Sequence, residues 1–103
     1  MSLDLFIEKM GEDNDTIRTS AIEAITKFGG IALPKLMQAL QDSNWVKRNS
    51  AIISIGNISN SNPKEVAKTI VLLLDCLKDS NSIIRATAAQ TLGKIYKVLK
   101  EKK

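Results

Sequence analysis

The sequence contains no histidine, a single cysteine and only four aromatic side chains in 103 residues. Without histidine the chain lacks the usual general base of enzymes, the partner that activates serine or cysteine nucleophiles, and the commonest protein ligand of metal ions. The single Cys76 can neither form an intramolecular disulfide nor complete a zinc site. We therefore predict a protein that is not an enzyme and that has no catalytic residues, no metal site and no cofactor.

Long apolar runs and phosphate-binding glycine loops are also missing. The longest apolar run, Ile70 to Leu74, is far too short to cross a bilayer, and no basic-then-apolar leader opens the sequence. Gly29-Gly30 is not followed by the Lys and Ser or Thr of a phosphate-binding loop. We expect a cytoplasmic protein without membrane contact, with a core built mainly from aliphatic side chains.

The net charge of +4 is unevenly distributed along the chain. Residues 1–30 hold three basic and six acidic side chains, a net charge of −3. Residues 31–62 carry +2, and residues 63–103, with nine basic and four acidic side chains, carry +5. The chain therefore runs from an acidic first part to a basic last part.

Three stretches of the chain align on one another: residues 12–28, 42–58 and 79–95. The aligned columns are Asn14, Asn44 and Asn81; Arg18, Arg48 and Arg85; Ala21, Ala51 and Ala88; and Ile25, Ile55 and Leu92. The arginines are spaced by 30 and then 37 residues. A self-similarity of this period is typical of a stacked repeat protein.

Hydrophobic residues recur at helical spacing through every repeat. Leu3, Phe6, Ile7 and Met10 lie at i, i+3, i+4 and i+7, which indicates an amphipathic helix. The same stripe returns in each later repeat, as Leu33, Leu36, Met37 and Leu40 and then as Ile70, Leu73, Leu74 and Leu77. The second helices should bury Ala21, Ile22, Ile25 and Phe28; Ala51, Ile52, Ile55 and Ile58; and Ala88, Ala89, Leu92 and Ile95. We predict six helices, near residues 2–11, 15–28, 31–41, 45–58, 63–78 and 82–100.

The turn before each second helix and its arginine resemble those of the HEAT repeat family, in the short variant first noted in phycobilin-lyase-like proteins. Residues 31–56 and 69–93 carry the resemblance, through Asp at the turn, then V/I-x-R or I-R, paired small residues and a final Leu-Gly or Ile-Gly. It implies an all-α fold, a right-handed α-solenoid of three helical hairpins. The single domain would span 1–103, with repeats about 2–29, 30–58 and 63–100.

The arginine column allows two interpretations. Arg18, Arg48 and Arg85 could form a basic ladder that binds phosphates or acidic peptides. Alternatively, each arginine pairs with a turn carboxylate of its own or an adjacent repeat, from the set Asp13, Asp42 and Asp79. We favour the second interpretation, because a repeated column follows from the repeated architecture itself.

Residues that break the repeat are more informative about function. Ile53 stands where the other repeats have Glu23 and Gln90, and Trp45 stands where they have Asp15 and Ser82. Trp45, Asn49 and Ile53 recur every fourth residue and so share one helix face. We predict a protein-binding surface at Trp45, Arg48, Asn49, Ile53, Glu23 and Gln90, on the concave side of a scaffold or adaptor. Its partner would be a helix or peptide of another protein, or a second copy of this chain.

An alternative is a nucleic-acid-associated module that uses the basic third repeat. Its candidate residues are Lys47, Arg48, Arg85, Lys94, Lys97, Lys100, Lys102 and Lys103. No aromatic side chains are interleaved with these lysines, as stacking on single-stranded bases would require. Salt separates the two functions, because phosphate-driven binding weakens steeply as ionic strength rises.

Overall fold

A computed structural model describes residues 2–101, and within this range every regular element is helical. Two short 3₁₀-helices, η1 and η2, accompany seven α-helices. In chain order the elements are α1 (Leu3–Lys9), α2 (Asp15–Phe28), η1 (Gly29–Ala32), α3 (Leu33–Ala39), α4 (Trp45–Ile58), α5 (Pro63–Val66), η2 (Ala67–Thr69), α6 (Ile70–Cys76) and α7 (Ser82–Glu101). Lys102 and Lys103 of the nucleic-acid hypothesis lie outside the described residues.

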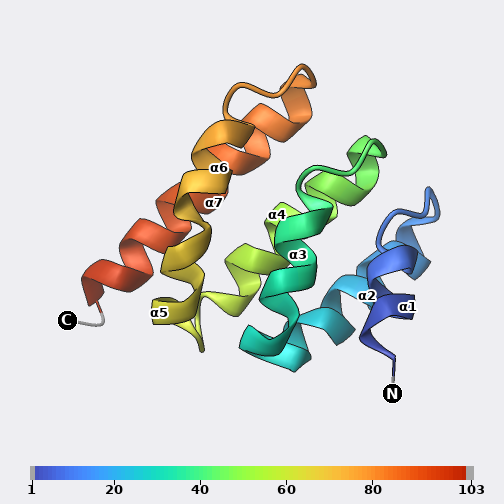
Figure 1. Ribbon diagram of the computed structural model, residues 1–103, viewed down its shortest axis with the longest axis horizontal. Coiled ribbons are helices and arrows are strands. Elements are labelled where there is room, and N and C mark those ends of the chain that lie inside the picture. The colour runs from blue at the N-terminus through green and yellow to red at the C-terminus, as the bar shows by residue number, and fades with distance from the viewer. Residues whose placement is uncertain (1, 102–103) are drawn as a thin grey trace.

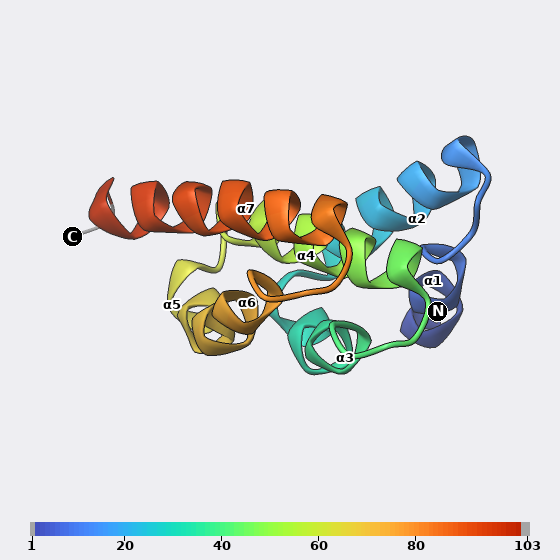
Figure 2. The same cartoon turned by 90° about the horizontal axis from the view of Figure 1, so that it is seen from above.

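The helices form two layers. Figure 2 shows α1, α3 and the α5–α6 segment side by side in one layer, and α2, α4 and α7 in the other. The first and last repeats lie at opposite ends of the stack (Figure 1). The central helix α4 packs against both α2 and α7. The predicted all-α solenoid of helical hairpins is confirmed.

Each second helix begins at an asparagine whose side chain caps it. The Oδ1 atoms of Asn14, Asn44 and Asn81 accept hydrogen bonds from backbone N–H groups at 2.9, 3.0 and 2.8 Å. These groups have no partner inside the helix, so the caps fix where each second helix starts. Gly29 ends α2 with a φ of 65°, a left-handed value that glycine adopts without steric cost.

The first helix of the third hairpin differs from the prediction. The expected single helix over residues 63–78 is divided into α5, η2 and α6. Inside the break, the buried hydroxyl of Thr69 donates a hydrogen bond to the backbone carbonyl of Val66 at 2.7 Å. Side-chain bonds of this kind compete with the regular helical pattern. The second hairpin has a 3₁₀ turn at the equivalent place, where η1 ends at Ala32, so α3 and α6 begin at the same column of the repeat.

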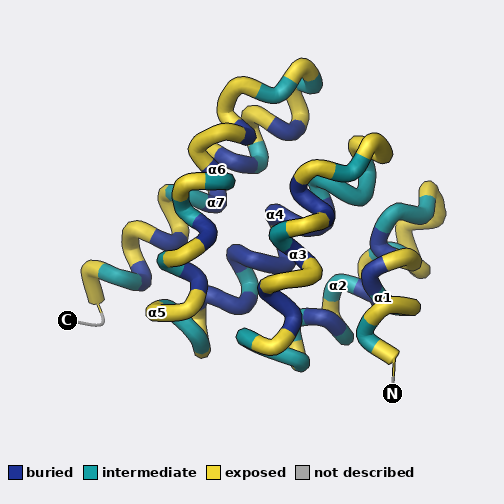
Figure 3. Tube along the Cα trace, in the orientation of Figure 1, coloured by how far each residue is buried: buried dark blue, intermediate teal, exposed yellow. Residues whose placement is uncertain are grey.

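The core is aliphatic and is centred on α4. Ala51, Ile52, Ile55 and Ile58, the predicted inward face of that helix, are all 0% exposed. In Figure 3 buried positions run along α4 in the middle of the stack, while the turns at the tips of the hairpins are mostly exposed. Burying a large aliphatic side chain stabilises the fold by about 1.5–3 kcal/mol, so this helix holds the neighbouring repeats together.

The prediction was wrong at one end of the stack. Leu74, Leu77 and Ala89 were expected to point inward, but all three are exposed, Leu74 by 49% and Leu77 by 37%. The corresponding residues of the second repeat are more buried: Met37 is half-buried, and Leu40 and Ile52 are 5% and 0% exposed. The inner repeat is covered on both sides by neighbours, whereas no described residue covers the outer side of the third.

Candidate functional site

The predicted face on α4 lines a hollow between the repeats. Trp45 and Ile53 are 40% and 36% exposed, and Asn49 lies between them. The hollow has a volume of about 310 Å³ and draws on all three repeats. Besides these three residues it is lined by Asp13, Asp15, Arg18, Val46, Ser50 and Ile83. Three of the six predicted site residues therefore come together in one concave feature.

Asn49, which lines this hollow, has one side-chain atom without a hydrogen-bond partner among the described residues. Its Oδ1 is buried and accepts no hydrogen bond from any residue in 2–101. A buried acceptor without a donor costs about 1–3 kcal/mol relative to one that is satisfied. A ligand that turns the Asn49 amide toward the hollow and donates an N–H group to this oxygen would recover that free energy.

The rim of the hollow on the side of the first repeat carries charge. The Arg18 guanidinium donates to the backbone carbonyls of Glu12 and Asp13 at 2.8 and 3.1 Å and forms an ion pair with Asp15. With two carboxylates and one guanidinium, this rim carries a net charge of −1. It suits a ligand that brings a positive charge.

Of the remaining predicted residues, Gln90 and Glu23 lie apart from this hollow. Gln90 lines a smaller hollow of about 210 Å³, which shares Ile53 with the first and also includes Thr87 and Lys94. Glu23 is exposed on α2 and lines neither hollow. Ile53 is therefore the residue at which the two hollows meet.

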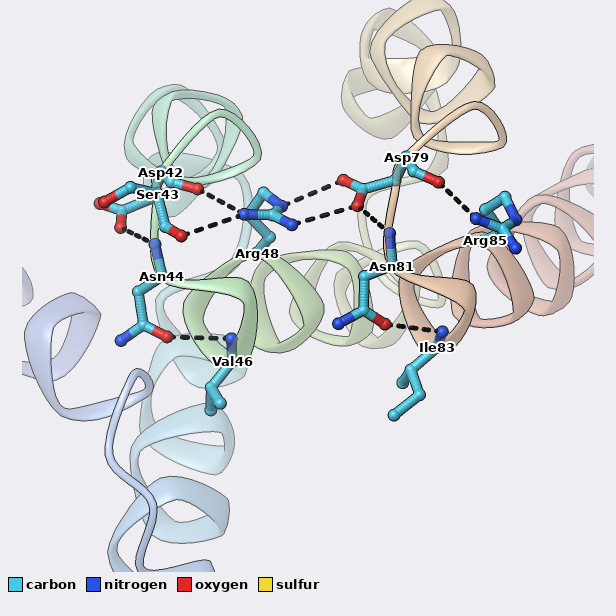
Figure 4. A network of polar contacts seen from close by, with 9 residues as sticks. All are labelled: Asp42, Ser43, Asn44, Val46, Arg48, Asp79, Asn81, Ile83 and Arg85. Carbon is cyan, nitrogen blue, oxygen red and sulfur yellow. Dashed lines mark hydrogen bonds and ion pairs between the residues drawn. The ribbon is translucent and has the colours of Figure 1, made fainter.

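Arg48 joins the second and third repeats (Figure 4). Its Nε and Nη2 donate to the two carboxylate oxygens of Asp79 at 3.0 and 3.1 Å, and its Nη1 donates to the backbone carbonyls of Asp42 and Ser43. The side chains of the pair are only 15% and 14% exposed. With its donors engaged within the fold, Arg48 acts as an inter-repeat tie.

The other two arginines of the column behave differently. Arg18 takes the Asp15 carboxylate rather than that of Asp13, and Arg85 donates to the backbone carbonyl of Asp79 at 2.7 Å. The expected pairing with an adjacent turn carboxylate is thus formed by Arg48 alone among the described residues. Asp15 is available to Arg18, while Arg48 and Arg85 have Trp45 and Ser82 at that position. Arg48 has the Asp79 turn of the next repeat beside it, whereas no repeat follows Arg85 within residues 2–101.

The turn carboxylates are held in their ionised form. The backbone N–H of Asn44 bonds to Asp42 at 2.9 Å and lowers the pKa of that carboxyl below its ordinary 3.8, with Lys47 adding to the effect. Desolvation acts to raise the pKa of Asp79, but the Asn81 N–H and the Arg48 guanidinium outweigh it, so that this pKa is also lowered. Both turns are therefore most stable with charged carboxylates.

The only cysteine is buried and its thiol is less acidic than usual. Desolvation raises the pKa of Cys76, and the nearby charges of Asp79 and Asp75 raise it further. A thiol with a raised pKa is a poor nucleophile. Across residues 2–101 no three side chains of His, Cys, Asp or Glu gather in a cluster that could hold a metal ion.

Several cations of the nucleic-acid hypothesis already have partners within the fold. Lys47 pairs with Asp42 at 3.2 Å, Arg48 with Asp79, and Lys94 donates to Asn57 at 3.4 Å. Lys97 and Lys100 are exposed along the last turns of α7. Among the described cations of this set, those without a side-chain partner are Arg85 near the start of α7 and Lys97 and Lys100 toward its end.

Sequence reasoning missed six of the nine lining residues of the hollow, namely Asp13, Asp15, Arg18, Val46, Ser50 and Ile83. The repeat register contained a signal for two of them, because Asp15 shares the column of Trp45 and Arg18 shares that of Arg48, both predicted site residues. Successive second helices lie side by side, so residues of equivalent columns line the same groove.

The fold defines the protein as a stack of helical hairpins. The sequence profile of HEAT repeats matches residues 33–102, and the chain belongs to this family. HEAT repeats generally mediate protein–protein interaction, and the family is typically a non-catalytic scaffold. None of the helices within residues 2–101 is long and apolar enough to span a membrane.

Proposed function

We propose that this protein is a non-enzymatic interaction module, a scaffold or adaptor that binds a peptide segment of another protein in the hollow at Trp45, Asn49 and Ile53. The observation that carries the proposal is the hollow of about 310 Å³, which is flanked by two exposed apolar side chains and lined between them by Asn49, whose buried Oδ1 has no donor within residues 2–101. An apolar centre with a polar rim is the usual anatomy of a protein-binding site.

The lining of the hollow specifies the chemistry of the ligand. An apolar side chain of the peptide would pack against Trp45 and Ile53, and an N–H group would donate to Asn49. A lysine or arginine of the peptide would lie toward the carboxylates of Asp13 and Asp15. Tryptophan is among the residues most enriched at binding hot spots, so Trp45 should contribute most to affinity.

Selection from a random peptide library tests this proposal and does not require an identified partner. Peptides displayed on phage are selected against the immobilised parent protein and depleted on a variant carrying Trp45→Ala and Ile53→Glu. We expect enriched peptides that combine an apolar anchor with a basic residue. They should bind the parent at least about tenfold more tightly than they bind the double variant, since losing one hot spot costs 2 kcal/mol or more.

The matched control is Ile31→Glu, which places the same charge at another exposed isoleucine of the middle repeat. This variant should bind the selected peptides as the parent does. If every enriched peptide binds the double variant as tightly as the parent, the hollow is not the binding site. Binding to duplex DNA that collapses at moderate salt, together with no peptide preference, would favour the nucleic-acid function instead.

A further inference from the structure

The outer side of the third repeat exposes large aliphatic residues. Val71, Leu74 and Leu77 are 70%, 49% and 37% exposed. In the second repeat the residues equivalent to the two leucines are Met37, which is half-buried, and Leu40, which is 5% exposed. A terminal repeat that only faces water normally has a polar outer side, so this side of the stack has the composition of an inner repeat.

The opposite end, formed by the first repeat, also exposes aliphatic side chains. Leu5 on α1 and Ile17 on α2 are 58% and 44% exposed. They are equivalent to Lys35 and Lys47, which in the second repeat face the first. The first repeat therefore carries apolar residues at positions where the next repeat carries lysines.

The repeat register pairs these two ends. Between the first and second repeats, Lys35 forms an ion pair with Asp4 at 2.7 Å. If a first repeat were stacked on a third repeat in the same way, Leu5 would take the place of Lys35 and Val71 the place of Asp4. Both members of the pair change from charged to aliphatic, so the contact stays complementary.

The arginine tie has an equivalent in the same arrangement. Arg48 of the second repeat forms an ion pair with Asp79 of the third at 3.0 Å. Arg85 is equivalent to Arg48, and Glu12 is equivalent to Asp79. If a first repeat were stacked on the third, Arg85 and Glu12 would therefore face each other as Arg48 and Asp79 do. Within residues 2–101 Arg85 donates a hydrogen bond to a backbone carbonyl and pairs with no carboxylate. In the same range Glu12 forms an ion pair only with the exposed Lys9, at 3.4 Å.

From these observations we propose that copies of this chain associate head to tail, the first repeat of one copy stacking on the third repeat of another. Charge favours this pairing, because residues 1–30 carry −3 and residues 63–103 carry +5. Contacts between two first repeats or two third repeats would oppose like charges. Head-to-tail contacts are heterologous, so they extend into rings or filaments.

This association uses surfaces other than the hollow at Trp45. A test that disproves the proposed peptide binding would therefore not disprove this association, and Trp45→Ala with Ile53→Glu should leave the association unchanged.

Two end-blocked variants test the proposal. Val71→Glu with Leu74→Glu places negative charge on the third-repeat end, and Leu5→Lys with Ile17→Lys places positive charge on the first-repeat end. All four residues are exposed in the single chain, so circular dichroism should show unchanged helicity and melting. Ile31→Glu serves as a control at the middle repeat. Sedimentation velocity at low salt measures the mass across a concentration series.

We expect the parent and the Ile31→Glu control to rise above the single-chain mass of 11.3 kDa as concentration increases. Each end-blocked variant alone should stay at that mass, and an equimolar mixture of the two should rise above it, because each variant supplies the end that is blocked in the other. A parent that stays at 11.3 kDa at the highest attainable concentration would overturn the proposal. Association of either blocked variant with itself would show an isologous contact and would equally overturn it.

Discussion

The Arg48–Asp79 pair should contribute measurably to stability as the polar tie between the second and third repeats. Its side chains are only 15% and 14% exposed, and two hydrogen bonds of 3.0 and 3.1 Å join them. Removing one partner of a buried pair costs about 3–5 kcal/mol, whereas exposed pairs contribute about 0.2–1 kcal/mol. Because this pair keeps some solvent contact, we expect Arg48→Met to lower the free energy of unfolding by about 2–3 kcal/mol.

A double-mutant cycle isolates the pair from the other bonds of each residue. Asp79→Asn keeps an oxygen that can accept from the Asn81 N–H, and Arg48→Met keeps the length of the side-chain stem. Urea unfolding followed by circular dichroism gives the stability of the parent, both single variants and the double variant. We expect a coupling energy of about 1–2 kcal/mol, in the range for residues in direct contact.

The exposed pair between Lys35 and Asp4 is the control for this cycle. It also joins two repeats, but its side chains are 46% and 69% exposed. Lys35→Met should therefore cost less than about 1 kcal/mol. If the Arg48 and Asp79 substitutions prove additive, or if Lys35→Met costs as much as either, the assignment of Arg48 as an inter-repeat tie is wrong.

Three further predictions concern the core, the helix glycines and acid stability. Ile55→Ala, at a side chain that is 0% exposed, should cost about 2–4 kcal/mol in urea unfolding; a cost below about 1 kcal/mol would contradict its central place in the core. Gly93→Ala should raise the free energy of unfolding by up to about 1 kcal/mol, because nothing lies within 4 Å of the new Cβ. Gly56→Ala should raise it less, because its Cβ would meet Thr91 at 3.1 Å. Equal effects of the two substitutions on thermal melting would refute this packing. Since the pKa of Asp79 is lowered in the fold, its contribution is complete above the ordinary 3.8 and is lost as the pH falls through the lowered pKa, so acid should destabilise the parent more than Asp79→Asn; parallel stability curves would rule this out.

The repeat alignment predicted most of the fold because each element depends on local chemistry. Helical spacing of aliphatic residues and an asparagine before each second helix were enough to place α2 and α4 at their observed bounds. The 3₁₀ turns η1 and η2 could not be predicted in this way, because the spacing of apolar residues does not distinguish a 3₁₀ turn from the first turn of an α-helix. The exposure of Leu74 was missed for another reason, since burial at that position depends on a neighbouring repeat.

The candidate site was predicted in part. The repeat-breaking positions identified Trp45 and Ile53, because an apolar residue in an otherwise polar column has no structural need to be there. The carboxylates on the rim and the unpaired oxygen of Asn49 depend on how three helices lie side by side, and no single-sequence pattern shows this.

Fluorescence of Trp45 tests the central claim most directly, because it is the only tryptophan of the chain and lies in the hollow. A selected peptide without tryptophan is titrated into the parent, into Asn49→Leu and into Ile31→Glu. We expect the parent and Ile31→Glu to show the same saturable blue shift of the emission, and Asn49→Leu to require at least about fivefold more peptide, since one hydrogen bond contributes about 1 kcal/mol. A peptide that binds the parent by calorimetry yet leaves the Trp45 emission unchanged would show that the protein is recognised elsewhere.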